Sequence, residues 1–257
     1  MENLRIIWKT KVLQPSRIFL NRLQINSSDL KMLDTLDTKV TSITKKNQDQ
    51  LPLTVGILIF DQVEVLDVAG PFEVFAVSRL NEERRQEESS PFRVLLLSEN
   101  MDKVSAIGGL RFIPDVTIDN CPELDLLIVP GGRGTRTQVK NASLLGWIAN
   151  MSNKTRLTAS VCTGSSLLGK AGLLDRREAT THWRAFDFLR KAAPTALIRE
   201  DVQFTLAEPI FTSAGISAGI DMALRIVSYF FGKEVGQATA RHMEYPYPQD
   251  DGRRYNI

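Results

Sequence analysis

The chain of 257 residues is 43% hydrophobic and 24% charged, which is the composition of a globular protein with a sizeable core. Its formal net charge is only +2, and no apolar run approaches the roughly 20 residues that span a bilayer. Neither nucleic-acid binding nor membrane insertion is therefore expected. Two cysteines are too few for a disulfide framework, so a reducing cytoplasm is the expected location.

Residues 1–51 differ from the rest of the chain. They carry nine Lys and Arg against five Asp and Glu, which leaves 23 against 25 for residues 52–257. Short apolar groups such as Ile6-Ile7-Trp8 alternate with basic residues, without the continuous apolar region and cleavage site of a secretory signal. A targeting presequence is one interpretation. The pattern favours a poorly ordered basic extension, followed by a single domain over residues 52–257.

The domain opens with two predicted strands and a helix between them. The continuous apolar run 53–60 is typical of a parallel strand buried on both faces. Pro71 suits the first turn of a helix that runs to about Leu80. The charged residues 81–90 indicate a surface loop, and residues 92–98 form the second predicted strand.

Asp67 stands between the first strand and this helix. A carboxylate at that place can cap the helix. It can also lie beside a reactive group and exchange a proton with it or with a substrate. Glu64 is the rival carboxylate, and its loop position favours exposure to solvent.

A glycine loop follows the next buried strand. A short strand is predicted at residues 110–113, and the strand 125–129 leads into Pro130-Gly131-Gly132-Arg133-Gly134. The backbone N–H groups of Gly131 and Gly132 could bind a developing negative charge, as an oxyanion hole does. Pro-Gly-Gly after a strand is also ordinary turn chemistry. A helix is predicted to follow and to reach about Asn153.

The stretch 157–183 carries the most specific local pattern. An apolar run ends at Val161, is followed by Cys162-Thr163-Gly164-Ser165, and continues as a Leu-rich helix to about Ala171. Strand, small-residue turn and helix are the layout of a nucleophile elbow, here with cysteine as the nucleophile. The N–H groups at the start of the helix would favour thiolate over thiol. The alternative is a buried structural cysteine that packs as a small hydrophobe.

The remaining elements complete an α/β pattern. They are a helix at 184–192, strands at 202–206 and 209–212, a glycine-bearing turn at 214–219 and a helix at 220–231. Strands that alternate with helices predict a doubly wound, mostly parallel sheet with helices on both faces. Ligands bind such sheets outside the carboxyl ends of the strands, where Asp67, Gly131-Gly132 and Cys162 are all expected.

The histidines and the second cysteine are given structural interpretations. His182 is a tempting partner for Cys162, but its place beside Trp183 favours packing or capping. His242 stands in a polar segment, and Cys121 precedes a proline in a turn. Two histidines and two cysteines this widely scattered form no metal-binding spacing, and no cofactor is expected.

Four stretches, LDVAGPFEV, LLIVPGGRGTR, SVCTGSSLLGKAGLLDRREATTHW and TSAGISAGIDMAL, resemble the ThiJ/PfpI superfamily over about residues 53–247. The resemblance implies a flavodoxin-like fold of the class I glutamine amidotransferase-like kind, and it favours the isonitrile hydratase (cyclohexyl-isocyanide hydratase) branch. It further implies a homodimer and a small-molecule substrate. Cys162 would be the nucleophile and Asp67 its carboxyl partner, with Thr163 positioning substrate and water.

Departures from other branches narrow the expected function. Thr163 stands where protease and glyoxalase-like members carry histidine, and Asp67 replaces the glutamate common in the redox-sensing branch. Arg133 adds a charge beside the expected pocket. The expected activity is that of a hydro-lyase that hydrates an isonitrile to an N-substituted formamide. The alternative is a non-catalytic ligand- or redox-sensing domain like that of AraC-type regulators, without the DNA-binding module, since about ten residues follow Pro248.

Overall fold

The computed structural model describes residues 51–248. The extension predicted over residues 1–51 therefore lies outside the described residues, apart from Leu51. The part of the predicted domain that follows Pro248 also lies outside them.

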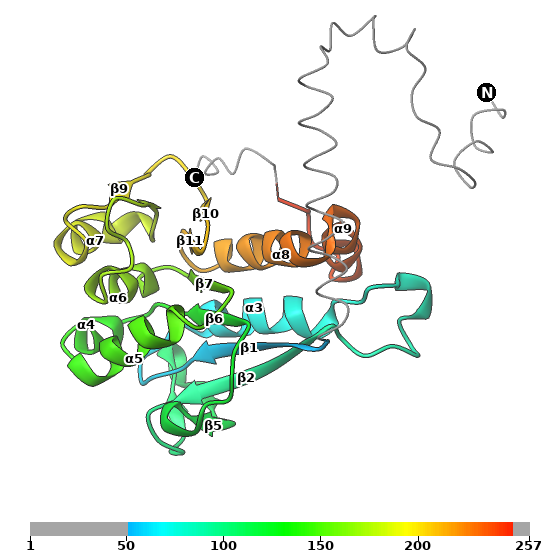
Figure 1. Ribbon diagram of the computed structural model, residues 1–257, viewed down its shortest axis with the longest axis horizontal. Helices are drawn as coiled ribbons and strands as arrows, with labels where there is room; N and C mark the ends of the chain where they lie inside the picture. Colours follow the sequence, from blue (N-terminus) through cyan, green and yellow to red (C-terminus); the bar gives the residue numbers. More distant parts are fainter. Residues whose placement is uncertain (1–50, 249–257) are drawn as a thin grey trace, which may run out of the picture. The chain divides into compact units, whose positions relative to one another are not determined.

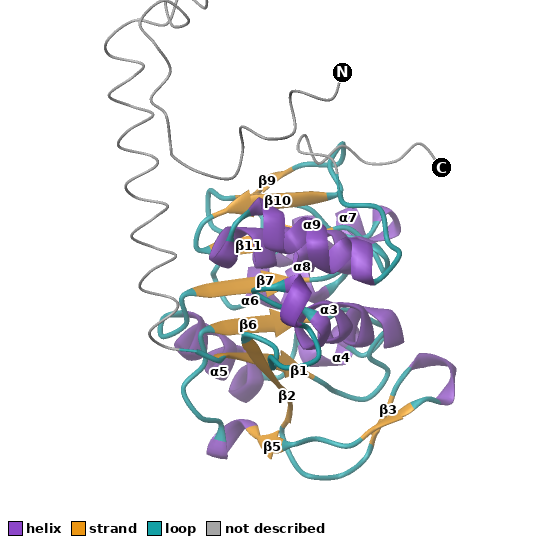
Figure 2. Ribbon diagram, turned by 90° about the vertical axis from the view of Figure 1, so that its right-hand side faces the viewer, coloured by secondary structure: helices purple, strands orange, loops and turns teal. Residues whose placement is uncertain are grey.

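A seven-stranded sheet forms the centre of the described region, and Figure 2 shows its strands one above the other. In spatial order they are β10 (Phe204–Ala207), β11 (Ile210–Ser213), β7 (Leu157–Ser160), β6 (Leu126–Val129), β1 (Leu53–Leu58), β2 (Phe92–Ser98) and β5 (Val116–Thr117). Neighbouring strands are parallel except for the β10–β11 hairpin. The order β2-β1-β6-β7-β11 is that of a flavodoxin-like sheet, as predicted.

Helices cover both faces of this sheet. They are α3 (Val65–Val77), α4 (Thr135–Gln138), α5 (Ala142–Ser152), α6 (Gly164–Lys170), α7 (Phe186–Ala192), α8 (Ala218–Phe231) and α9 (Lys233–His242). The chain steps from β1 to β2 in one direction and from β6 to β7 in the other, so right-handed crossovers place α3 and α5 on opposite faces. Consistent with this, α3 packs with α8 and α9, whereas α6 packs with α4, α5 and α7 (Figure 1).

The core lies on both sides of the central strands. Every residue of β6 and β7 is buried, which explains why β6 is apolar throughout and why neither strand alternates buried with exposed residues. On the α3 face, the fully buried ring of Phe75 contacts the ring of Phe92 on β2, with centroids 4.9 Å apart. This aromatic contact fixes α3, which carries Asp67, against the sheet.

The structure corrects several element boundaries. The helix predicted to begin at Pro71 begins at Val65, so Asp67 lies in its first turn and Pro71 inside it. Pro71 has no N–H to donate to the carbonyl of Asp67, and the helix tolerates that single missing bond. The predicted long helix after the glycine loop is divided into α4 and α5, because Asn141 caps a new helix by accepting the Leu144 N–H at 3.2 Å.

Other elements were not predicted or were placed in the wrong sheet. The predicted strand 110–113 is β4 (Arg111–Phe112), which pairs with β3 (Val104–Ser105) in a separate ribbon. A second small pair, β8 (Glu178–Ala179) with β9 (Leu197–Ile198), and the whole of α9 were missed. Helix α9 is polar and contains Gly236, whose missing side chain leaves room for Ser228 of α8.

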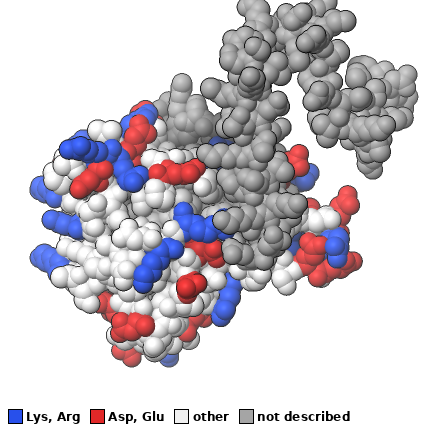
Figure 3. Space-filling model, in the orientation of Figure 1, with Lys and Arg blue, Asp and Glu red and all other residues white. Residues whose placement is uncertain are grey.

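The surface of the described region carries mixed charge. On the face shown in Figure 3, separate groups of acidic and basic side chains lie among uncharged ones, with several basic side chains along the left edge. Among residues 51–248, no helix is long and apolar enough to cross a membrane.

Truncation of the aromatic contact between α3 and the sheet tests the core. We expect Phe75→Ala to lower the free energy of unfolding by about 3–5 kcal/mol, because a fully buried ring leaves a cavity. Urea denaturation measures this loss. Ile113→Ala is the control, since that side chain is 65% exposed and its loss should change stability by no more than about 0.5 kcal/mol. Equal effects in the two variants would contradict the assignment of Phe75 to the core.

Candidate active site

The predicted site residues meet at the point where the strand order of the sheet reverses. Strands β1, β6 and β7 are parallel neighbours, so the segments that follow them lie at one edge of the sheet. Asp67 follows β1, Gly131 and Gly132 follow β6, and Cys162 and Thr163 follow β7. Two hydrogen bonds connect these segments: the Gly131 N–H donates to Asp67 Oδ2 at 2.9 Å, and the Gly132 N–H donates to Thr163 Oγ1 at 3.0 Å.

Cys162 lies on a strained turn of the kind predicted. Its φ of +56° is in the left-handed region, which is unfavourable for a residue with a side chain. The turn is held because the Cys162 N–H donates to the Ala214 carbonyl at 3.1 Å, while the hydroxyls of Ser165 and Thr181 donate to the Cys162 carbonyl at 3.1 and 2.8 Å. A side chain at Gly164 would collide with the Val129 carbonyl, so only glycine allows this helix to begin so close to β6.

Asp67 is a buried carboxyl rather than a helix cap. It is fully buried, and its Oδ1 oxygen has no hydrogen-bond partner of normal geometry, whereas Oδ2 accepts the Gly131 N–H. Burial raises the pKa of Asp67 to about 8, the Gly131 N–H opposes that rise, and the charge of Glu64 adds to it. Asp67 is therefore mostly protonated at neutral pH.

The protonation state of Cys162 differs from the one predicted from the sequence. Its side chain is only 7% exposed, and burial raises the pKa of its thiol above the ordinary value, with the charge of Asp67 adding to the rise. The N–H of Thr163 acts in the opposite direction and is too weak to reverse it. The expected preference for thiolate is therefore wrong for the free protein, because α6 has only seven residues and desolvation outweighs its partial charge.

The glycine loop packs closely against Asp67 and the elbow that carries Cys162. A methyl group on Gly131 would lie 2.5 Å from the Thr163 nitrogen and 2.9 Å from Cys162 Cβ, so the loop can approach the elbow only with glycine at this position. The N–H groups of Gly131 and Gly132 already have partners in Asp67 and Thr163, and their role as oxyanion donors stays a prediction. Thr135, which was not singled out from the sequence, donates its hydroxyl to the Gly132 carbonyl at 2.7 Å.

Glu64 and His182 lie close to the site in different ways. The Glu64 N–H donates to the Gly131 carbonyl at 3.0 Å, and its charge raises the pKa of both Asp67 and Cys162. The interpretation of Glu64 as a simple solvated residue was thus incomplete.

His182 is confirmed as a packing and capping residue: Nδ1 accepts the Arg184 N–H at 3.2 Å, and its ring stacks on Trp183.

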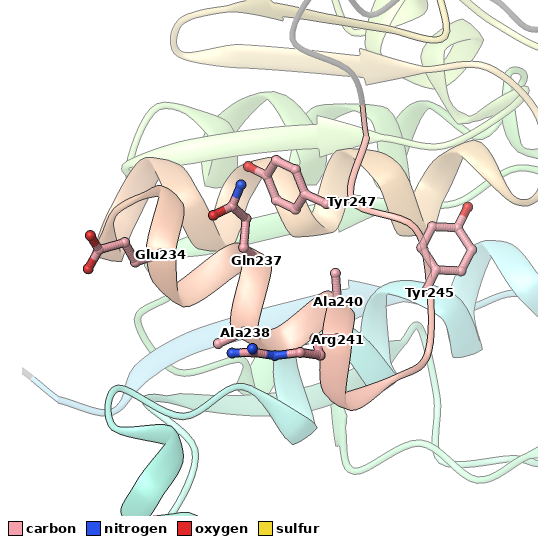
Figure 4. Close-up of a pocket in the computed structure, with 7 residues that line it drawn as sticks. All are labelled: Glu234, Gln237, Ala238, Ala240, Arg241, Tyr245 and Tyr247. Carbon is pink, nitrogen blue, oxygen red and sulfur yellow. The ribbon is translucent and has the colours of Figure 1, made fainter. Parts of the chain in front are cut away.

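A separate cavity of about 490 Å³ lies between α9 and the segment that follows it (Figure 4). Its lining includes Tyr245 and Tyr247, whose hydroxyls hydrogen-bond to Asp221 and Ser228 of α8. None of the predicted site residues lines this cavity. Among residues 51–248, no group of three or more His, Cys, Asp or Glu side chains is arranged to hold a metal ion.

A flavodoxin-like sheet with a cysteine elbow at its switch point defines the class of this protein. Residues 53–229 match the model of the DJ-1/PfpI family, and the chain belongs to that family. It is 35% identical to the isonitrile hydratase of Pseudomonas putida over 204 residues, which cover 78% of this chain and 82% of that protein.

Two further relatives show the range of the family. The HTH-type transcriptional regulator GbdR of Pseudomonas aeruginosa is 29% identical over 198 residues, 77% of this chain, and the chain spans about half (52%) of that regulator. A crystal structure of a ThiJ/PfpI family protein from Pseudomonas syringae superposes with a TM-score of 0.67 at 27% identity, over 79% of this chain and 81% of that one.

Adding one methyl group to the loop tests its close approach to the elbow. We expect Gly131→Ala to lower the free energy of unfolding by about 1–3 kcal/mol, because the new Cβ overlaps the Thr163 backbone. The matched control is Gly146→Ala in α5, where a Cβ meets nothing within 4 Å. That change should stabilise the helix by about 0.5–1 kcal/mol. A neutral Gly131→Ala in urea denaturation would contradict the close approach.

The protonation of Asp67 predicts a pH-dependent stability. The pKa of Asp67 rises from an ordinary 3.8 to about 8 on folding. The protonated carboxyl therefore stabilises the folded state fully below pH 3.8, and this contribution is lost as the pH rises to about 8. Asp67→Asn cannot ionise. Its stability relative to wild type should increase from about pH 5 to about pH 8 and then level off. Urea denaturation of both proteins across this range measures the difference, and a constant difference would show that Asp67 is already ionised.

Proposed function

We propose that this protein hydrates an isonitrile, R–NC, to the N-substituted formamide R–NH–CHO. The observation that carries the proposal is that Asp67 and Cys162 are both buried and interact with each other, with Thr163 next to them at Gly131 and no histidine after the cysteine. The similarity to an isonitrile hydratase over most of both chains supports it. A neutral acid and a neutral thiol suit a neutral, apolar substrate, because no buried charge is left uncompensated before the substrate binds.

The first step would form a bond between sulfur and carbon. The Asp67 carboxyl gives its proton to the terminal carbon of the isonitrile, and Cys162 Sγ attacks the same carbon. The thiol proton passes to the Asp67 carboxylate, which is thereby reprotonated. The product is a thioimidate, R–N=CH–S–Cys162, and Asp67 has acted as acid and then as base.

The second step would consume water. Water adds to the thioimidate carbon, its hydroxyl stays on that carbon, and the nitrogen gains a proton. The C–S bond then breaks, the hydroxyl proton is transferred through Asp67 to Cys162 Sγ, and R–NH–CHO leaves. Thr163 Oγ1, which accepts the Gly132 N–H, would orient the water. Gly131 would assist by fixing the direction of the Asp67 carboxyl.

A sensing domain is the second candidate, because the chain is also similar to part of the regulator GbdR. Cysteines that sense oxidants are accessible and have a lowered pKa. Cys162 is buried and its pKa is raised, which does not fit a redox-sensing cysteine. A sensing domain could instead bind a ligand without converting it, and this is the form of the second candidate that remains. In either case we expect a cytoplasmic homodimer, and sedimentation velocity measures the oligomeric state.

An isonitrile turnover assay separates the two candidates. Loss of an isonitrile and appearance of its formamide are followed for wild type and variants. We expect many turnovers per protein, complete loss in Cys162→Ala, and a decrease of about 10²–10⁴-fold in kcat for Asp67→Asn, because the acid and base are removed. Thr163→Val should decrease kcat less.

The matched control is Cys121→Ala, which removes the other cysteine, and it should retain full activity. Binding of isonitriles without formamide production, with Cys162 intact, would refute hydration in favour of a ligand-sensing role.

A further inference from the structure

Two threonine hydroxyls meet at the Gly132 carbonyl. Thr135 is the first residue of α4 and follows β6, whereas Thr163 follows β7 directly after Cys162, and both threonines are buried. The Thr135 hydroxyl oxygen lies 2.7 Å from the Gly132 carbonyl oxygen, and the Thr163 hydroxyl oxygen lies 3.2 Å from it. The two hydroxyl oxygens are 3.1 Å apart. The proposed function uses Thr163 and gives Thr135 no role.

The two hydroxyl protons can be arranged in two ways. Each threonine hydroxyl has one proton to donate and two lone pairs that accept. In the first arrangement Thr135 donates to the Gly132 carbonyl, and the Thr163 proton is left for a molecule in the site. In the second, Thr135 donates to Thr163 Oγ1 while Thr163 donates to the Gly132 carbonyl. Both lone pairs of Thr163 Oγ1 are then occupied, because the Gly132 N–H donates to it in either arrangement.

The distances favour the first arrangement. Hydrogen bonds between a hydroxyl and an oxygen are commonest at about 2.7–2.8 Å, which is the separation of the Thr135 hydroxyl from the Gly132 carbonyl. The competing bond from Thr163, at 3.2 Å, is long for two oxygens and therefore weak. The Gly132 carbonyl also accepts the Thr135 N–H at 3.3 Å, so its second lone pair is occupied as well. Thr135 therefore takes the carbonyl, and Thr163 keeps its proton for another acceptor.

We propose that Thr135 is a positioning residue that occupies the Gly132 carbonyl and so leaves the Thr163 hydroxyl proton for the water that reacts with the thioimidate. The Gly132 N–H fixes Thr163 Oγ1 in place. The Thr163 proton then binds one lone pair of the water, and the other lone pair attacks the carbon. This inference rests on the role of Thr163 in the proposed function. The direction of the two hydroxyl protons is a property of the resting protein and can be observed without an isonitrile.

Kinetics of isonitrile hydration by the full-length protein test the role of Thr135. In Thr135→Val the Gly132 carbonyl accepts the Thr163 proton instead, so kcat should decrease about fivefold with KM unchanged, the effect of one neutral hydrogen bond. Thr135→Ser keeps the hydroxyl and should restore most of the wild-type kcat. In a Thr163→Val background, Thr135→Val should have no further effect, because no proton is left to direct. An equal decrease in both backgrounds, or no rescue by serine, would contradict the inference.

Thr158→Val is the matched control. The Thr158 hydroxyl is also buried and donates to Ser152 Oγ at 2.9 Å, but it lies near the amino end of β7, away from Cys162. This variant should retain the wild-type kcat. A loss of kcat as large as that in Thr135→Val would show that removal of any buried hydroxyl has this effect, and would overturn the positioning role.

Neutron diffraction of the deuterated full-length protein separates this inference from the proposed function. We expect the deuterium on Thr135 Oγ1 to point at the Gly132 carbonyl oxygen, and the deuterium on Thr163 Oγ1 to point away from it. A Thr163 deuterium directed at the Gly132 carbonyl would overturn the inference, whatever the kinetics show. Absence of isonitrile turnover by wild type would refute the proposed function, and the deuterium positions would still decide whether Thr135 occupies the carbonyl.

Discussion

The site depends on the backbone of Gly131. Its carbonyl accepts the N–H of Glu64, its N–H donates to Asp67 Oδ2, and its Cα lies against the elbow that carries Cys162. One residue thus connects the segments that follow β1, β6 and β7. Because these contacts need a residue without a side chain, the same constraint that shapes the loop also sets the position of the acid relative to the thiol.

Burial, rather than helix electrostatics, decides the charge state of the pair. Both side chains are buried beyond the carboxyl ends of the central strands, and a lone negative charge is costly there. The short helix α6 and the Thr163 N–H lower the cost of a thiolate but do not remove it. In the reaction that we propose, the isonitrile accepts a proton as the sulfur–carbon bond forms, so no lone negative charge is left in the buried site.

The errors made from the sequence have physical causes that are visible in particular residues. Pro71 is usual in a first helical turn, but the packing of α3 against β2 and α8 extends the helix six residues before it. Helix α9 has a polar sequence with an internal glycine, and its stability comes from close packing on α8 at Gly236. Glu64 looked like an ordinary loop carboxylate because its contact with Gly131 joins residues 67 positions apart.

The sequence by itself determined the fold class, the elbow at Cys162 and the five residues of the candidate site. Continuous apolar strands, a Cys-Thr-Gly turn and a Pro-Gly-Gly loop are local patterns that few other structures can satisfy. Only the tertiary structure decided which side chains are buried without a charge partner, what the N–H groups of Gly131 and Gly132 bind, and that the Glu64 N–H binds the Gly131 carbonyl. These properties depend on burial and on distances between segments far apart in the chain, and no local pattern encodes either of them.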